Sequence, residues 1–151
     1  MQLRDFLYSD REIYYTMSAD FYRSGAALHD VNPQHLESTF DAIMASSPFV
    51  RGFIIEEAGK PAGFALLSLT WTNEAGGLCV LIEELYICPE FRGAGLGSAV
   101  LNDIFRQYPQ AKRFRLEVTH TNTRARRLYE SLGFEVLDYV NMVIDRPDGD
   151  C

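Results

Sequence analysis

This 151-residue sequence contains few residues that could bind a metal ion or form a disulfide bond. Its three cysteines are an odd number without metal-like spacing, and its three histidines form no ligand set with one another. Cys79 and Cys88 lie in one predicted strand and cannot bridge within it. We therefore expect no metal site and a reduced, cytoplasmic setting.

Long apolar runs and an excess of positive charge are also missing. No stretch of about eighteen apolar residues occurs, so we predict no membrane-spanning helix and no membrane partner. The first residues lack a basic segment followed by an apolar one, which argues against a cleaved signal. The net charge of −7 argues against a nucleic-acid partner and favours a cationic small substrate over an anionic one.

What is present is one domain of helical and strand-like patterns over residues 1–151, without repeats or linkers. The order β-α-α-β-β-β-α-β-α-β-(β) predicts an α/β fold, a mixed sheet with helices on both faces. Expected strands cover residues 3–8, 53–57, 64–72, 78–88, 112–119 and, as one or two strands, 134–145. Expected helices run from a capping box at Ser9 and Glu12 to Gly25, from Asn32-Pro33 to before Pro48, and over 96–106 and 123–132. Residues 146–151 are expected to be a frayed tail.

The stretch 82–100, IEELYICPEFRGAGLGSAV, joins a strand, a glycine-rich turn and a helix start. Glycine N–H groups can approach a ligand closely, and a helix N-terminus adds unpaired donors, so the stretch suits a phosphate or pyrophosphate. It is not a Walker A loop, because no Gly-Lys-Ser/Thr follows. It is not a GxGxxG motif, because Ser98 and Val100 stand where the last glycine should be. A turn that needs glycine only for its backbone angles is the alternative.

Two motifs in this order resemble those of a known superfamily. Arg92-x-x-Gly95-x-Gly97 resembles the Arg/Gln-x-x-Gly-x-Gly/Ala segment with which GNAT N-acyltransferases wrap the pyrophosphate of acyl-CoA. Their second signature is matched by Asn122-x-x-Ala125-x-x-x-Tyr129, followed by Leu132-Gly133-Phe134. The resemblance covers nearly the whole chain and implies the GNAT fold, with acetyl-CoA as co-substrate. It also implies that strands 78–88 and 112–119 part to admit the thioester. Many members dimerise, so a homodimer is compatible with the sequence, although no residue identifies an interface.

The resemblance also assigns residues to the co-substrate. The backbone at the end of strand 78–88 would pair with the pantetheine arm and supply an N–H for the oxyanion. Asn122 is placed to bind pantetheine or an ordered water, and it is also the expected N-cap of the following helix. The co-substrate residues are Leu85, Tyr86, Ile87, Arg92, Gly93, Ala94, Gly95, Leu96, Gly97, Ser98, Asn122 and Ala125.

Acyl transfer to an amine needs a proton acceptor for the ammonium and a proton donor for the departing thiolate. Tyr129 occupies the position of the tyrosine that hydrogen-bonds the CoA sulfur, which makes it the candidate donor; on spacing alone, a tyrosine packed on an amphipathic helix is the commoner case. Glu83 and Glu84 resemble the two successive acids of spermidine/spermine-type acetyltransferases. By position, Glu83 would draw off the amine proton through water, and Glu84 would orient the acceptor or be solvated. Adjacent strand residues face opposite sides unless a β-bulge re-aims one of them.

Candidates on the acceptor side come from the loop between the first two helices, which covers the acceptor in the GNAT fold. This loop nominates Tyr22, Ser24 and His29, and Trp71 at the end of the middle strand is a further candidate; a lone loop histidine is more often solvated. The leading hypothesis is an enzyme that transfers acetyl from acetyl-CoA to a primary amine of a small, cationic acceptor. A protein lysine or N-terminus as acceptor, and a CoA-binding sensor without turnover, are the alternatives.

Overall fold

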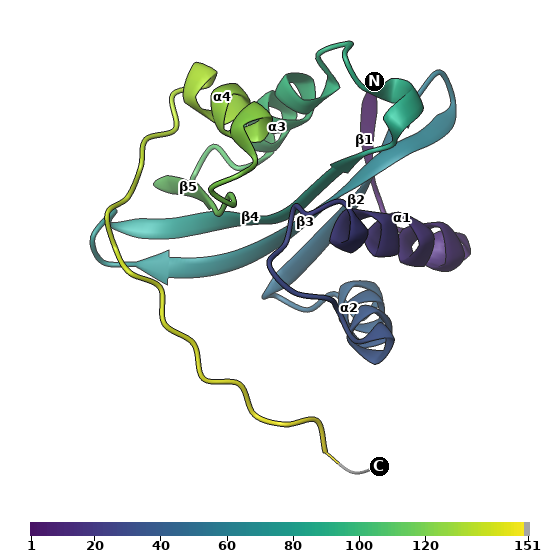
Figure 1. The fold of residues 1–151 in the computed structure, drawn as a ribbon, viewed down its shortest axis with the longest axis horizontal. Coiled ribbons are helices and arrows are strands. Elements are labelled where there is room, and N and C mark those ends of the chain that lie inside the picture. Colours follow the sequence, from purple (N-terminus) through teal and green to yellow (C-terminus); the bar gives the residue numbers. More distant parts are fainter. Residues whose placement is uncertain (150–151) are drawn as a thin grey trace.

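The computed structural model describes residues 1–149, in which five strands form one mixed sheet (Figure 1). The strands are β1 (Gln2–Asp5), β2 (Val50–Glu57), β3 (Lys60–Thr72), β4 (Gly77–Ile87) and β5 (Arg113–Leu116). They lie in chain order across the sheet, and each neighbouring pair is antiparallel except β4 and β5. That last pair is parallel because a helical crossover carries the chain back between them.

Helices cover both faces of this sheet. They are α1 (Arg11–Arg23), α2 (Pro33–Met44), α3 (Leu96–Gln107) and α4 (Thr123–Ser131). Two short 3-10 turns, Tyr8–Asp10 and Pro89–Phe91, precede α1 and α3. α1 and α2 pack on one face, and α3 and α4 lie on the other (Figure 1). The expected mixed α/β architecture is therefore confirmed.

The sheet is buried on both faces because its central strands alternate between two cores. Phe53 and Ile55 of β2 pack in the α3 core, whereas Ile54 between them packs in the core of α1 and α2. Val100 and Ile104, one helical turn apart on α3, are fully buried in the first core. This two-sided burial fixes the register of the strands, and the register decides which side chains meet at the site.

Side-chain caps mark two of the helix starts that the sequence predicts. Asn32 accepts a hydrogen bond from the Gln34 N–H at 3.0 Å, with Pro33 in the first turn of α2, and Asn122 accepts one from the Ala125 N–H at 3.2 Å. The capping box expected at Ser9 and Glu12 is wrong. A 3-10 turn occupies Tyr8–Asp10, so α1 begins only at Arg11. The carboxylate that accepts a hydrogen bond from a backbone N–H in this region is that of Asp10, and the donor is the Leu7 N–H.

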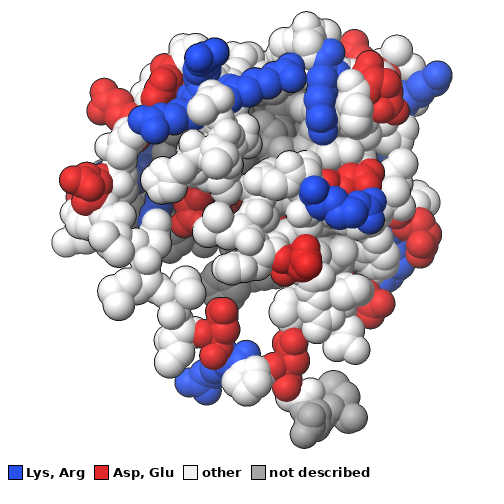
Figure 2. All heavy atoms as spheres, in the orientation of Figure 1, with Lys and Arg blue, Asp and Glu red and all other residues white. Residues whose placement is uncertain are grey.

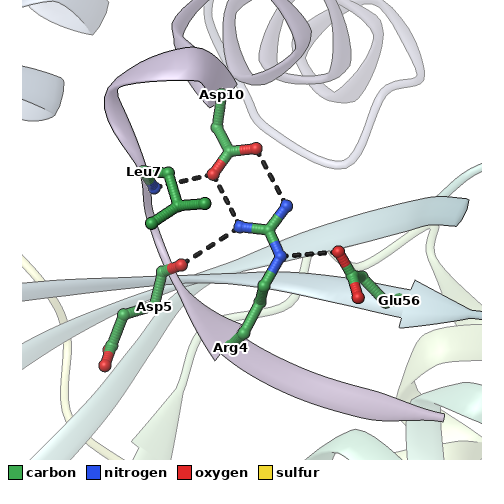
Figure 3. Close-up of polar contacts among 5 residues, drawn as sticks. All are labelled: Arg4, Asp5, Leu7, Asp10 and Glu56. Carbon is green, nitrogen blue, oxygen red and sulfur yellow. Dashed lines mark hydrogen bonds and ion pairs between the residues drawn. The ribbon is translucent and has the colours of Figure 1, made fainter. Parts of the chain in front are cut away.

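A partly buried ion-pair network ties β1 to the start of α1 (Figure 3). Arg4 donates from Nη1 and Nη2 to the two carboxylate oxygens of Asp10 at 2.7 and 2.9 Å, and from Nε to Glu56 at 2.6 Å. The Leu7 N–H donates to the same Asp10 carboxylate at 2.7 Å. Burial alone would raise the pKa of Asp10, but the bonds from Arg4 and Leu7 outweigh it and hold that pKa below its ordinary value of 3.8.

We expect Arg4→Met to lower the free energy of unfolding by roughly 3 kcal/mol, because it leaves a buried carboxylate without its counter-charge. Urea titration followed by circular dichroism measures the loss. The depressed pKa of Asp10 makes its stabilisation fully present above 3.8, the unfolded value, and lost as the pH falls through the lower folded value. The difference in the free energy of unfolding between wild type and Arg4→Met should therefore shrink as the pH falls below 3.8.

Arg106→Met is the matched control, because it removes an exposed ion pair with Asp103 on α3. It should change the free energy of unfolding by less than about 1 kcal/mol. If the two arginine variants lowered the free energy of unfolding equally, the buried network would contribute no more to stability than the exposed ion pair.

The strand or strands expected over residues 134–145 do not form. The segment runs past the end of the sheet towards α2 (Figure 1) and is held by side chains, for example by Tyr139, whose hydroxyl donates to Glu74 at 2.7 Å. Alternating apolar residues predict extended backbone, but a strand also needs a backbone partner, and β5 forms no ladder with this segment in the described chain. Its apolar side chains are consequently 87–95% exposed at Val140, Met142, Val143 and Ile144.

The expected tail carries no helix or strand over residues 146–149. Asp148 nevertheless contacts His35 at the start of α2, with 2.7 Å between Oδ1 and Nε2. Residues 150–151 lie outside the described residues.

β5 is shorter than the expected strand 112–119, and this opens the sheet beside β4. The parallel ladder joins Cys79–Ile82 to Arg113–Leu116 and ends at Ile82. β4 continues to Ile87 without β5 beside it. The ladder between these two strands therefore ends at Ile82, because β5 itself ends at Leu116.

Candidate active site

A cleft of 620 Å³ opens where the ladder between β4 and β5 ends. It lies between the end of β4, the glycine turn before α3, and the first turns of α4. Ala94, at the tip of the glycine turn, is the predicted co-substrate residue that does not line it. The predicted residues that line it are Leu85, Tyr86, Ile87, Arg92, Gly93, Gly95, Leu96, Gly97, Ser98, Asn122, Ala125 and Tyr129.

The glycine turn uses its glycines for two different reasons. Gly93 and Gly95 have φ of +83° and +76°, a left-handed conformation that strains residues with a Cβ. Gly97 sits under α4, where an added Cβ would lie 3.0 Å from Leu128 Cδ2, so glycine lets the two helices approach. Gly95 is the N-cap of α3, and its carbonyl receives the first helical bond, from Ala99. The N–H groups of residues 96–98 precede that bond and are free for an anion.

Arginine side chains stand at the mouth of this cleft. Arg92 donates from Nε to the Ile87 carbonyl at 2.8 Å, and its guanidinium lies over the Tyr86 ring, 5.6 Å from the centroid. Arg124 of α4 also lines the cleft. Figure 2 shows Lys and Arg side chains gathered along the α3 and α4 edge, around a hollow. In a chain of net charge −7, this edge is the part suited to phosphate groups.

Tyr129 brings a phenol from α4 into the same cleft. It is half-buried and packs edge-to-face on Phe134, with ring centroids 5.9 Å apart. Burial raises the pKa of Tyr129, so its hydroxyl is protonated at neutral pH and can act as a proton donor. The ring also borders a second cavity of 1030 Å³ between β5, α4 and residues 134–141.

The two glutamates of β4 lie at a β-bulge. Glu84 stands opposite Leu66 of β3 and Ile82 stands opposite Leu67, which leaves Glu83 as an extra residue without a partner. Glu83 is exposed and accepts a hydrogen bond from the Ser68 hydroxyl at 2.6 Å. Glu84 is only 7% exposed, so the suggestion that it is solvated is wrong. Both side chains lie on the face of the sheet that α1 and α2 cover, because Ile82 and Leu85 on either side of them pack on the opposite face.

Burial raises the pKa of Glu84. The hydrogen bond from Tyr22 lowers it in part, and the charge of Glu83 raises it further. Tyr22 donates to Glu84 Oε1 at 2.5 Å, which brings two of the predicted acceptor-side residues together. A carboxylate with a raised pKa is a better proton acceptor at neutral pH than an ordinary one.

Two predicted residues are not brought to this place. His29 is exposed in the loop between α1 and α2. Trp71 is 75% exposed and pairs with Leu78, five positions along β3 from the bulge partner Leu66, or about 17 Å along the strand. Neither side chain lines the cleft, and Tyr22, Glu83 and Glu84 are not among its lining residues either.

Some lining residues were not identified from the sequence. The end of α1 closes one side of the cleft, and Ser24, predicted for the acceptor side, lies in this wall. Gly25 has a positive φ of +80° just after the end of α1. A glycine that ends a helix is the sequence signal that could have identified this wall of the cleft. The residues missed are Phe21, Gly25, Ala26, Phe91, Thr121 and Leu128.

Two further searches cover residues 1–149 only. No group of three or more histidine, cysteine or carboxylate side chains in that range is arranged to hold a metal ion. No helix in the same range has both the length and the apolar character needed to cross a membrane.

Comparison with known proteins identifies the family of this arrangement. The model of the acetyltransferase (GNAT) family matches residues 10–134. An uncharacterized N-acetyltransferase of Methanocaldococcus jannaschii is 33% identical over 91 residues, which are 58% of this chain and 40% of that protein. A thialysine N-epsilon-acetyltransferase of Sus scrofa is 30% identical over 90 residues, 53% of this chain and 51% of that enzyme. The chain thus spans about half or less of the length of these relatives.

Solved structures agree on the fold. A possible acetyltransferase from Clostridium difficile 630 superposes with a TM-score of 0.81 at 17% identity, covering 97% of this chain and 98% of that one. The aminoglycoside acetyltransferase AAC(6')-Iy, in complex with a bisubstrate analogue, gives a TM-score of 0.77 at 17% identity, with the same two coverages. At such identities the likeness shows the fold alone.

Proposed function

The chain belongs to the acetyltransferase (GNAT) family, and on that premise we propose that it transfers the acetyl group of acetyl-CoA to a primary amine of a small, cationic acceptor. One observation carries the proposal: a single cleft unites the glycine turn before α3, Asn122 and the Tyr129 phenol. The pig relative is named for thialysine, and AAC(6')-Iy was solved with an analogue built on an acetylneamine. Both names support a small amine acceptor, and the net charge of −7 supports a cationic one.

The residues of the cleft fit acetyl-CoA. The free N–H groups of residues 96–98 and the Arg92 guanidinium suit a diphosphate. The stretch 85–87, beyond the end of the β4–β5 ladder, offers backbone groups and apolar side chains to a pantetheine arm. Bound there, acetyl-CoA supplies an activated thioester.

Residues of the chain supply the three other functions that the reaction needs. A backbone N–H of residues 85–87 stabilises the carbonyl oxygen as it gains negative charge. A glutamate at the bulge, Glu83 or Glu84, accepts the proton that the amine nitrogen gives up as its bond to the acetyl carbon forms. Tyr129 donates a proton to the sulfur as the carbon–sulfur bond breaks. Atoms and charge balance without a metal or a covalent enzyme intermediate.

Calorimetric titration with CoA tests the first half of the proposal. The Kd should lie between about 1 μM and 1 mM, the usual range for such a substrate. Pantetheine, which lacks the diphosphate, should bind at least about tenfold more weakly, because it cannot use the donors of the glycine turn. Equal affinity for the two compounds would exclude the turn as the diphosphate site.

A thiol-release assay with acetyl-CoA tests the second half. We expect turnover with at least one compound in a panel of polyamines, basic amino acids and aminoglycosides, and none with neutral alcohols of similar size. Transfer to basic peptides alone would move the acceptor to a protein lysine or N-terminus. Tight binding of acetyl-CoA without transfer to any acceptor would identify a sensor and would refute the enzymatic proposal.

A further inference from the structure

The β-bulge in β4 turns both glutamates towards α1. Ile82 before the bulge and Leu85 after it both pack in the α3 core, although strict alternation would place residues three apart on opposite faces. The two residues between them are Glu83 and Glu84, and they take the other face. Ser68, which binds Glu83, belongs to that face too, because it lies two positions from Leu66 on β3.

The two carboxylates are nevertheless in different environments. Glu83 is exposed and is already bonded to the Ser68 hydroxyl. Glu84 is 93% inaccessible, and its two oxygens are not equivalent. Oε1 accepts the hydrogen bond from Tyr22, whereas Oε2 is fully buried without a hydrogen-bond partner among the described residues. A buried, unpaired carboxylate oxygen is unfavourable by itself and is stabilised by a positively charged donor.

Tyr22 is the residue that creates this asymmetry. It lies in the last turn of α1 and reaches across to β4, joining elements that are 62 positions apart in the chain. Its neighbour Phe21 lines the co-substrate cleft, and Leu85, next to Glu84, lines it from the other side. Tyr22 and Glu84 do not line the cleft themselves, but each is the sequence neighbour of a residue that does. The hydrogen bond therefore holds the Glu84 carboxylate beside the wall of the cleft, with Oε1 bonded and Oε2 buried without a partner among the described residues.

We propose that Tyr22 is a positioning residue that holds Glu84 by Oε1, so that Oε2 receives a single ammonium group of the acceptor and takes its proton. The proposal rests on the proposed acetyl transfer and narrows its acceptor to a primary or secondary amine that is protonated before it binds. It gives the proton-accepting role to Glu84, the buried acid, instead of to Glu83, which the sequence position favours.

The charged and titratable groups around Glu84 set the expected pH dependence. Tyr22 and Tyr14 face it from α1, and Glu83 faces it from its own strand. On β3, its partner Leu66 does not titrate. Burial raises the pKa of Glu84, the Tyr22 hydrogen bond lowers it and the Glu83 charge raises it, so the two neighbours act in opposite directions.

Three variants separate these effects in the pH profile of kcat/KM for the amine. Tyr22→Phe removes the stabilising donor and should move the acid limb up by about one pH unit. Glu83→Gln removes the like charge and should move the limb down. Glu84→Gln should abolish the limb and reduce kcat/KM by about 100-fold or more. Tyr15→Phe is the matched control, because Tyr15 also lies on α1 but its hydroxyl contacts Arg11; it should leave the profile unchanged.

The opposite pattern would overturn the proposal. If Glu83→Gln abolishes the limb while Glu84→Gln keeps it, the exposed acid is the proton acceptor. If Tyr22→Phe changes the KM for acetyl-CoA but not the limb, Tyr22 acts only on packing.

The positioning role can also be tested without turnover. Carbon-13 NMR of the labelled glutamates measures the Glu84 pKa directly in wild type and in Tyr22→Phe. A pKa that does not rise in the variant would overturn the positioning role, even if the wild-type protein acetylates no amine. If the wild-type protein transfers acetyl but Tyr22→Phe leaves the Glu84 pKa unchanged, the proposed function stands and only the positioning role of Tyr22 is refuted.

Discussion

Tyr129→Phe should reduce the rate of thiol release from acetyl-CoA by a factor of roughly 10² to 10⁴, the usual contribution of a positioned general acid. The change removes one oxygen and keeps the ring that packs on Phe134. The KM for acetyl-CoA should stay within about threefold, because a donor that acts on the departing sulfur contributes in the transition state and little in the bound ground state. Stopped assays with a saturating amine measure both constants.

Tyr108→Phe is the matched control for Tyr129. Tyr108 follows α3, is buried to a similar or greater degree, and its hydroxyl contacts Arg51 instead of the cleft. It should leave turnover unchanged. If Tyr129→Phe also left turnover unchanged, the phenol would be a packing residue and the proton would have to come from solvent.

Gly95→Val should weaken CoA binding at least about tenfold, because the left-handed backbone at this position orients the free N–H groups at the start of α3. A β-branched residue at φ of +76° is strained by about 1–2 kcal/mol or more, and the turn can relieve that strain only by rotating. No atom lies within 4 Å of an added Cβ, so the effect comes from the backbone and not from a clash. Calorimetry with CoA measures the affinity and a thermal melt measures the strain.

Gly76→Val separates strain from ligand binding. Gly76 ends the turn between β3 and β4, has φ of +85° and also has open space around an added Cβ. It should lower the melting temperature by a similar amount and leave CoA affinity unchanged. Wild-type affinity in Gly95→Val would mean that the turn does not hold the diphosphate.

Much of this site could be predicted from the sequence because its parts are local. The glycine turn depends on φ at Gly93 and Gly95, and the start of α4 depends on the Asn122 cap, each within a few neighbouring residues. Local chemistry of this kind appears in the sequence as a motif.

Features that depend on a partner strand could not be predicted in the same way. The bulge at Glu83 exists only relative to β3, so the sequence of β4 does not say which glutamate is buried. The position of Trp71 relative to the bulge depends on the same register. The apolar alternation of residues 134–145 predicts extended backbone but says nothing about whether a strand is available to pair with it.

A shift of one residue explains another difference. Spacing predicts Ile13, Met17 and Phe21 on the inner face of α1, and Met17 and Phe21 are buried there. Ile13 is 38% exposed, and Tyr14 takes the inner place instead. Residues three and four apart share a helical face, so spacing alone does not choose between 13 and 14.

The extra residue in β4 makes the length of that strand part of the chemistry. Counted from Ile82, it exchanges odd and even positions for the rest of the strand, which sends Leu85 and Ile87 to one core and Tyr86 to the other. A different side chain at position 83 leaves this count intact. Deleting that position would leave Glu84 opposite Leu66 and the three following side chains in their present cores, because the extra residue is the one removed. Straightening the bulge while keeping every residue would instead exchange those three side chains between the two cores.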